Sequence, residues 1–152
     1  MPVSWPAYGG PPAASRAHHG STALVGSQEA ELDMIKIVAL IKRRPDVTLE
    51  EFCHYYEHRH APLFARTIPP DVADAIKHYV QNHAVRLGRS STDPPYDCVT
   101  EIGFDDVAGM QLWTNWYLGE EGRVLRDDEE TFMDPRQRVV IVTDERQIGV
   151  QR

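Results

Sequence analysis

The chain has 152 residues, enough for one domain with a substantial hydrophobic core. Its formal net charge of −7 argues against a nucleic-acid partner, which would need a basic surface. The sequence shows no apolar run long enough to span a membrane and no basic-then-apolar signal peptide at its start. Cys53 and Cys98 provide neither a disulfide framework nor zinc-ligand spacing. We therefore expect a cytoplasmic protein with reduced thiols that binds neither nucleic acid nor a membrane.

The start of the chain differs in composition from the remainder. Residues 1–33 are rich in Pro, Gly, Ala and Ser, which bury too little apolar surface to fold alone. We expect an extended N-terminal arm here, a folded domain over residues 34–146 and a charged C-terminal tail over residues 147–152.

The first half of the expected domain contains a strand and a long helix. Residues 34–41 are β-branched and almost entirely apolar, which predicts a central strand. Thr48 and Glu51 form a Thr-x-x-Glu capping box, so the helix should begin at Leu49. Because Pro62 removes a backbone hydrogen bond, this helix should loosen near His60. Two prolines at positions 69 and 70 should end it.

The second half predicts three more strands and a shorter helix. Apolar residues alternate over 75–87, 96–104 and 138–143, and Asp105 or Asp106 should cap a helix between the last two. The order β-α-β-β-α-β predicts a ferredoxin-like α+β fold with its helices on one sheet face. Since Val, Ile and Leu occupy both sides of the first and last strands, we predict a homodimer in which two sheets pack face to face.

One motif has the spacing of a metal site. His54-Tyr-Tyr-Glu-His58 matches the His-x-x-Glu-His pattern of inverted zinc peptidases. At about 100° per residue, however, both imidazoles fall opposite the apolar stripe of the helix and should face solvent. We therefore expect no metal at this motif.

His60, in contrast, lies in the middle of the apolar stripe. An imidazole there is either a satisfied core histidine or a working group in a pocket. His83 shares a strand face with Tyr79 and Gln81. If that face looks toward the helix, His60, His83 and Tyr79 converge in one cavity. If it looks toward a dimer partner, the strand supplies polar interface groups, and the alternation alone does not decide between the two.

The carboxylates each allow two interpretations. Glu101 and Asp97 lie in an otherwise apolar strand, so each carries either a raised pKa suited to proton transfer or a salt bridge to Lys36 or Arg86. Asp134, which precedes a proline, is either a turn-forming residue or a carboxylate at the mouth of a pocket.

The remaining candidates are aromatic. Tyr56 and Phe64 on the helix stripe, with Trp113 and Trp116 on the second helix, are either core residues or apolar walls that bind a substrate. The sequence contains no phosphate-binding glycine loop, no Ser-His-Asp order and no flavin or nicotinamide fingerprint, so we expect no cofactor. What remains is acid–base chemistry in a small apolar pocket.

Several stretches resemble the EthD-domain family of the dimeric α/β-barrel superfamily. They are Met34–Pro45, Thr48–Phe52, His60–Leu63, Tyr79–His83, Tyr96–Asp97 with Glu101, and Phe132–Asp134. The resemblance covers residues 34–146. It implies a ferredoxin-like protomer, a homodimer that forms a dimeric α/β barrel, and a pocket between helices and sheet. The catalytic positions that it implies are His60, Tyr79, His83, Asp134 and Glu101.

The expected activity is therefore that of a cofactor-independent lyase or isomerase of the dehydratase, decarboxylase or cyclase type. Its substrate would be a hydrophobic cyclic or aromatic small molecule, polyketide-like or catabolic. His60 would act as the general base, His83 or Tyr79 would hold the developing enolate, and Asp134 or Glu101 would orient an imidazole or shuttle the proton. The alternatives are a non-catalytic dimer that binds a hydrophobic ligand or supports an oxygenase, and a haem protein with His60 as axial ligand.

Overall fold

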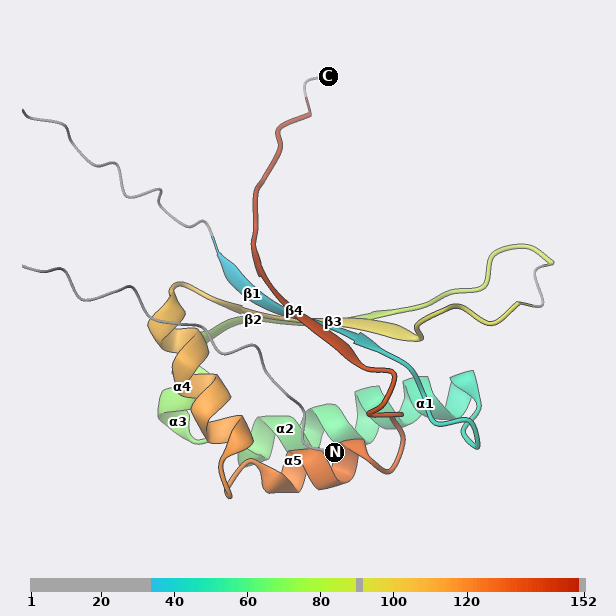
Figure 1. The fold of residues 1–152 in the computed structure, drawn as a ribbon, viewed down its shortest axis with the longest axis horizontal. Helices are drawn as coiled ribbons and strands as arrows, with labels where there is room; N and C mark the ends of the chain where they lie inside the picture. The colour runs from blue at the N-terminus through green and yellow to red at the C-terminus, as the bar shows by residue number, and fades with distance from the viewer. Residues whose placement is uncertain (1–33, 90–91, 151–152) are drawn as a thin grey trace, which may run out of the picture. The chain divides into compact units, whose positions relative to one another are not determined.

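The described part of the chain, residues 34–89 and 92–150, contains four strands and several short helices in a computed structural model (Figure 1). The expected N-terminal arm, residues 1–33, lies outside the described residues. In chain order the elements are β1 (Ile35–Ile41), α1 (Leu49–Tyr55), the π-helical turn η1 (Tyr56–His60), α2 (Ala61–Thr67), α3 (Pro70–Ala75), β2 (Ile76–His83), β3 (Cys98–Phe104), α4 (Val107–Leu118), α5 (Arg123–Glu129) and β4 (Val139–Asp144).

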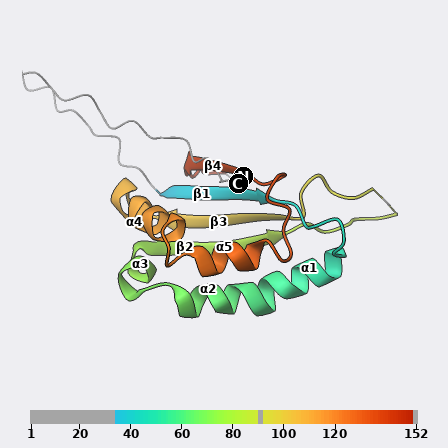
Figure 2. The ribbon, with the colours of Figure 1, turned by 60° about the horizontal axis from the view of Figure 1, so that its bottom comes forward.

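The strands form one antiparallel sheet in the order β2-β3-β1-β4. Each half of the chain contributes a split β-α-β unit, and the two units interleave in the sheet. Figures 1 and 2 show the helices on the same side of the sheet. This is a ferredoxin-like α+β fold, which confirms the predicted fold class.

The strand register assigns each side chain to one sheet face. Ala39 pairs with Thr100, and Thr100 pairs with Gln81 on the other side, so these three side chains face the helices. Val38 pairs with Glu101 on the opposite face. Among the described residues, no helix covers that opposite face (Figure 1). The predicted alternation in β3 is confirmed.

The core lies between the helices and the covered sheet face. Phe52 is fully buried there, and its ring lies 5.7 Å from that of Tyr56 and 5.7 Å from that of Phe132. Ile41, Cys98 and Met133 complete this cluster. Burying a side chain of this size contributes about 1.5–3 kcal/mol, so the cluster fixes α1 against the sheet.

The first helix begins as predicted and changes its pitch near His60. Thr48 Oγ1 accepts the amide of Glu51, and the Glu51 carboxylate accepts the amide of Thr48, which confirms the capping box. Residues 56–60 then form a π-helical turn in which the amide of Ala61 donates to the carbonyl of Tyr56. Pro62 has no amide hydrogen and cannot make the regular α-helical bond, and the wider turn accommodates this break in the hydrogen-bond pattern. The predicted loosening of the helix is confirmed.

Three segments differ from the sequence predictions. A further helix, α3, begins at Pro70, because proline is tolerated in the first helical turn. β2 ends at His83 rather than near residue 87, and Val85 beyond it is 74% exposed. A helix for which the sequence pattern makes no prediction, α5, covers the acidic segment before Phe132 and buries only Leu125.

The second predicted helix is α4, with 12 residues. Asp106 caps it by accepting the amide of Gly109 at 2.8 Å, as the sequence predicts. Within residues 34–89 and 92–150, no helix is both long and apolar enough to cross a lipid bilayer.

Candidate functional site

The π-helical turn directs His60 into the protein interior. Its side chain is only 3% exposed, and its ring lies 5.3 Å from Phe132 and 5.5 Å from Tyr56. Nδ1 of His60 lies 2.7 Å from Oδ2 of Asp128 on α5. A neutral imidazole in this geometry donates from Nδ1 and keeps the lone pair of Nε2 available for a proton.

Two adjacent carboxylates of α5 flank this imidazole. Asp128 also accepts the hydroxyl of Tyr55 at 2.7 Å, which fixes its position. Glu129 Oε1 lies 3.8 Å from Nε2 of His60. The other oxygen of Glu129 accepts the Tyr117 hydroxyl at 2.6 Å and Nη1 of Arg138 at 2.7 Å. The negative charges of both carboxylates would therefore stabilise the imidazolium that forms when Nε2 takes a proton.

The sheet contributes a second group of polar side chains. Tyr79, Gln81 and His83 all face the helices, which settles the question that the alternation leaves open. His83 Nε2 lies 3.0 Å from Oε1 of Gln81, and Nε2 of Gln81 donates to the Tyr79 hydroxyl at 3.1 Å. The structure therefore places His83 and Tyr79 in one hydrogen-bonded row under the helices.

Tyr56 links this row to His60. Its ring lies 5.5 Å from that of His60 and 5.8 Å from that of His83. Its hydroxyl shares a 2.6 Å hydrogen bond with Thr100 Oγ1. Burial raises the pKa of Tyr56 well above its usual value and also raises the pKa of Tyr79. Both phenols therefore stay protonated and can donate hydrogen bonds.

His83 is the second imidazole of the site. Burial lowers its pKa, so the neutral form is favoured. Its Nδ1 atom is buried and has no hydrogen-bond partner among the residues that the structure describes. An unpaired buried ring nitrogen of this kind is available to a polar atom of a ligand.

Glu101 lies elsewhere. It is on the sheet face opposite the helices, and Nζ of Lys36 donates to it at 2.8 Å. That hydrogen bond holds the pKa of Glu101 below its usual value, so the expectation of a raised pKa is wrong for this residue. The alternative, a salt bridge to Lys36, is what the structure contains. The structure does not bring Glu101 together with His60.

Asp97 and Asp134 also have structural partners. Asp97 is fully buried and accepts the backbone amide and the guanidinium of Arg43. Asp134 accepts the amide and guanidinium of Arg136 and the amide group of Gln137, an arrangement typical of a turn. The Arg136 guanidinium holds the pKa of Asp134 below its usual value. The carboxylate bonded to His60 is thus neither Asp134 nor Glu101.

The aromatic candidates form a continuous row behind Tyr79. The ring of Phe64 stacks on Tyr79 at 4.5 Å and lies 5.3 Å from that of Trp113. Trp116 follows at 5.5 Å from Trp113. All three are buried, so they form the apolar end of the helix–sheet interior. Their role in binding a substrate stays a prediction.

The two histidines of the zinc-peptidase spacing are exposed. His54 and His58 lie on the outer side of α1 and η1 with their rings 4.8 Å apart, as the helical periodicity predicts. Within the described residues, no three His, Cys, Asp or Glu side chains converge as a metal site would require.

Sequence reasoning missed the partners of His60. Asp128 and Glu129 belong to an acidic segment for which the pattern predicts no helix. Tyr55 and Arg138, which donate to these two carboxylates, belong to no recognisable motif. Leu125 was the available signal, because an apolar residue within a charged segment can anchor an amphipathic helix. Such a helix would have directed attention to its acidic residues.

These features define a ferredoxin-like α+β protein with a histidine held between carboxylates beneath its sheet. The chain belongs to the EthD domain family, whose model matches residues 44–136, more than half of the sequence. The predicted resemblance is thereby confirmed.

Solved structures share the fold of this chain. An ethyl tert-butyl ether D (EthD) family protein from Bacillus halodurans is 20% identical, with a TM-score of 0.52, and the match covers 74% of this chain and 99% of that one. An EthD-like protein from Ralstonia eutropha is 15% identical, with a TM-score of 0.54 and coverage of 74% and 91%. A hypothetical protein from Arabidopsis thaliana is 13% identical, with a TM-score of 0.51 and coverage of 82% and 100%. At these identities the likeness shows the fold alone. Among curated proteins, none matches the chain.

Proposed function

We propose that the protein is a cytoplasmic, cofactor-independent lyase or isomerase that abstracts a proton next to a carbonyl group. Its substrate is a hydrophobic cyclic or aromatic small molecule, polyketide-like or catabolic. The observation that carries the proposal is the 2.7 Å contact between His60 Nδ1 and Asp128, which leaves Nε2 as the base, with the Glu129 carboxylate 3.8 Å away to stabilise its protonated form.

The proposed reaction begins when Nε2 of His60 takes the proton of a C–H bond beside the carbonyl. The electron pair of that bond moves into an enolate, whose oxygen accepts a hydrogen bond from Tyr79 or Tyr56, because both phenols stay protonated. In a dehydration, the enolate then expels a hydroxyl group from the neighbouring carbon. The imidazolium returns its proton to this group, so that water leaves and His60 is neutral again. Asp128 orients the imidazole throughout.

A non-catalytic role is the second candidate. It is favoured by the tight packing of His60, which contacts Phe132 and Tyr56 and is 3% exposed. A substrate would have to displace side chains to reach Nε2. In this alternative the protein is a dimer that binds a hydrophobic ligand or supports an oxygenase.

In either case we propose a homodimer built on the sheet face that the described helices leave uncovered. Ile141 on β4 is 48% exposed on that face, and Val139 beside it is 39% exposed. Val38, Leu40, Val80 and Val99 share the same face. These apolar residues surround the Lys36–Glu101 ion pair on the same face, and a second copy packed on this face would bury them.

The test of the reaction is hydrogen exchange at carbon. In deuterated buffer, NMR would follow the loss of carbon-bound protons next to the carbonyl in a panel of enolisable aromatic ketones. One member of the panel is 2-tetralone, whose C1 proton would be observed. The wild type should accelerate exchange for at least one ketone of the panel. His60→Ala should reduce that acceleration by a factor of about 10²–10⁴. His54→Ala, a substitution on the exposed side of the same helix, is the matched control. Equal exchange in His60→Ala and wild type would sink the assignment, and a panel without any acceleration would favour the non-catalytic alternative.

A further inference from the structure

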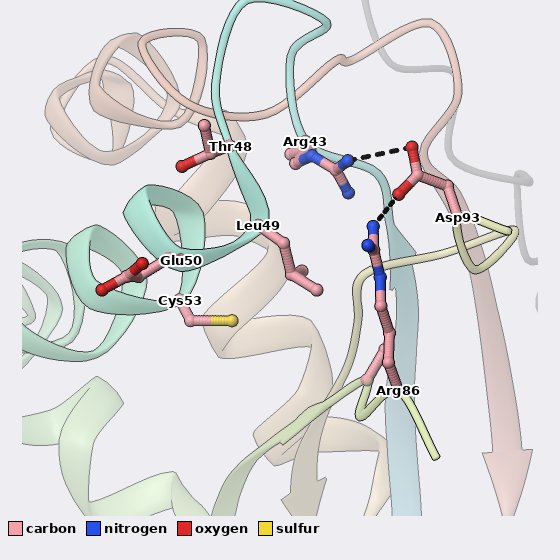
Figure 3. Close-up of a pocket in the computed structure, with 8 residues that line it drawn as sticks. Arg43, Thr48, Leu49, Glu50, Cys53, Arg86 and Asp93 are labelled. Carbon is pink, nitrogen blue, oxygen red and sulfur yellow. Dashed lines mark hydrogen bonds and ion pairs between the residues drawn. The ribbon is translucent and has the colours of Figure 1, made fainter. Parts of the chain in front are cut away.

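A groove separate from His60 opens at the end of the sheet where β2 ends, beside Ala84 and Arg86. Its volume is about 690 Å³, within the range of small-molecule sites. Figure 3 shows that α1 forms one side, while Arg43 and Arg86 point toward Asp93 on the other. The lining residues are Arg43, Thr48, Leu49, Glu50, Cys53, Ala84, Arg86 and Asp93.

Arg43 is held in place from below. Its Nη1 lies 2.5 Å from Oδ1 of Asp97, and its Nε donates to the carbonyl of Val47 at 3.0 Å. Asp97 is fully buried, so this part of the arginine cannot turn away. The remaining Nη2 donates toward the groove, to Asp93 at 3.1 Å. One donor of a fixed guanidinium is therefore directed at the groove.

Arg86 provides the second guanidinium. It donates to Oδ1 of Asp93, while Arg43 donates to Oδ2, so one carboxylate bridges the two arginines. The hydrogen bond from the Arg43 guanidinium holds the pKa of Asp93 below its usual value. The arrangement fits a planar group with two oxygens.

Asp93 is a replaceable occupant of this arginine pair. Its side chain is 53% exposed and that of Arg86 is 42% exposed. Exposed ion pairs contribute little to stability, because water screens them and both side chains lose freedom. A ligand carboxylate can therefore take the place of Asp93 without disturbing the buried contacts of Arg43.

The other side of the groove is suited to a hydrocarbon group. Leu49 and Cys53 on α1 and Ala84 after β2 provide apolar surface. Glu50 is the acidic side chain on the α1 side of the groove, so a second anionic group on the ligand would be disfavoured. The ligand should carry one acid group and an apolar body.

We propose that this groove binds an amphipathic monocarboxylic acid, whose carboxylate replaces Asp93 between Arg43 and Arg86. The apolar body lies against Leu49, Cys53 and Ala84. The inference does not depend on the role of His60, and it assigns a binding site in its own right.

The test compares an acid with its neutral counterpart on the full chain. Calorimetry and amide NMR would measure the binding of 4-phenylbutyrate and of 4-phenylbutanamide. The acid should shift the amide signals of Leu49, Cys53 and Ala84 and bind at least tenfold more tightly than the amide.

Arg86→Gln should weaken binding of the acid at least fivefold. Asp93→Asn should strengthen it several-fold, because the internal competitor loses its charge. Asp46→Asn, which alters an exposed carboxylate paired with Arg44, is the matched control and should change nothing.

The gain in Asp93→Asn is the decisive measurement, because a misfolded variant cannot bind more tightly. Equal affinity for acid and amide, or weaker binding of the acid by Asp93→Asn, would overturn the proposal, as would the absence of binding in both wild type and Asp93→Asn. His60→Ala should bind 4-phenylbutyrate as the wild type does. The two proposals can therefore fail separately. If the wild type binds 4-phenylbutyrate but exchanges no carbon-bound proton, only the proposed function fails. If it exchanges the proton but does not bind 4-phenylbutyrate, only the groove proposal fails.

Discussion

Nδ1 of His60 lies 2.7 Å from Oδ2 of Asp128, although 68 positions separate the two residues in the sequence. His60 belongs to the first β-α-β unit, whereas Asp128 lies in the second, on a helix between α4 and β4. The contact therefore exists only when both halves of the fold have assembled. It gives the imidazole one defined tautomer, which a proton-abstracting base requires.

Asp128→Asn tests whether this contact positions the base. An amide can still accept the Tyr55 hydroxyl, but it has no charge and can donate to Nδ1, which would move the imidazole proton to Nε2. We expect carbon exchange to fall by roughly 10²–10⁴ while the fold persists. The ¹⁵N shifts of the His60 ring should report the change of tautomer, and the accompanying loss of carbon exchange distinguishes a working base from a purely structural histidine.

Asp127→Asn is the control for that substitution. Asp127 is the neighbouring residue on α5, and it is exposed and paired with Arg123. This variant should keep both the exchange rate and the ring shifts of the wild type. A wild-type exchange rate in Asp128→Asn would show that the carboxylate does not position a working base.

Phe132 should be among the residues on which stability depends most. Its ring lies 4.8 Å from that of Tyr55, 5.3 Å from Tyr56 and 5.3 Å from His60, so it joins the core to the site. Phe132→Ala should lower the free energy of unfolding by about 3–5 kcal/mol, because it leaves a cavity between helix and sheet. Urea denaturation measures this loss. Val85→Ala, at a site that is 74% exposed, should stay within about 0.5 kcal/mol of wild type. A loss below about 1 kcal/mol in Phe132→Ala would contradict the packing described.

The fold was predictable because its signals are local. The capping box of Thr48 and Glu51 needs only four residues, and the alternation in β3 needs only seven. The loosened turn at His60 follows from Pro62 alone. The strand order then follows from the general rules for β-α-β connections. The cap, the alternation and the loosened turn each rest on residues that are close in the sequence.

The partners of His60 were not predictable in the same way. The sequence places His60 and Tyr56 on one helix face and His83 and Tyr79 on one strand face, but the strand register of the structure is needed to show that these two faces meet. Asp128 is different, because α5 has a weak apolar stripe and its contact with η1 depends on how α4 ends. Loops and short helices of this kind are positioned by tertiary packing, so their side chains cannot be placed from periodicity.

Glu101 should make the protein sensitive to acid. Its pKa is lowered in the folded state by the hydrogen bond from Lys36. A group with a lowered folded pKa contributes stability above its unfolded value near 4.5, and the contribution is lost as the pH falls through the folded pKa. We expect Glu101→Gln to be destabilised at pH 7 by an amount on the order of 1 kcal/mol. The difference from wild type should shrink as the pH falls below about 4.5.

Urea unfolding between pH 3 and pH 7, at one protein concentration, measures this profile. Lys36→Met supplies the matched background, because it removes the largest of the interactions that lower the pKa of Glu101. In that background, Glu101→Gln should change the pH dependence less than it does in the wild type, because only His78 and Asn82 then hold the pKa of Glu101 down. A constant difference between Glu101→Gln and wild type across the whole range would argue against the linkage.

The uncovered sheet face should determine the oligomeric state. Ile141 lies on β4 opposite Val38, and both side chains point away from the helices. A carboxylate at position 141 would be buried without a partner if a second sheet packs there, and this cost opposes association. Ile141→Glu should therefore weaken the dimer at least 100-fold, as measured by analytical ultracentrifugation. Val124→Glu, at an exposed site on α5, adds the same charge to the helical side and should leave the dimer intact. If Ile141→Glu sediments as the same dimer as the wild type, the copies associate through another surface. If the wild type is monomeric, the homodimer proposal fails, and the half-exposed Val139 and Ile141 of β4 are not buried by a second copy.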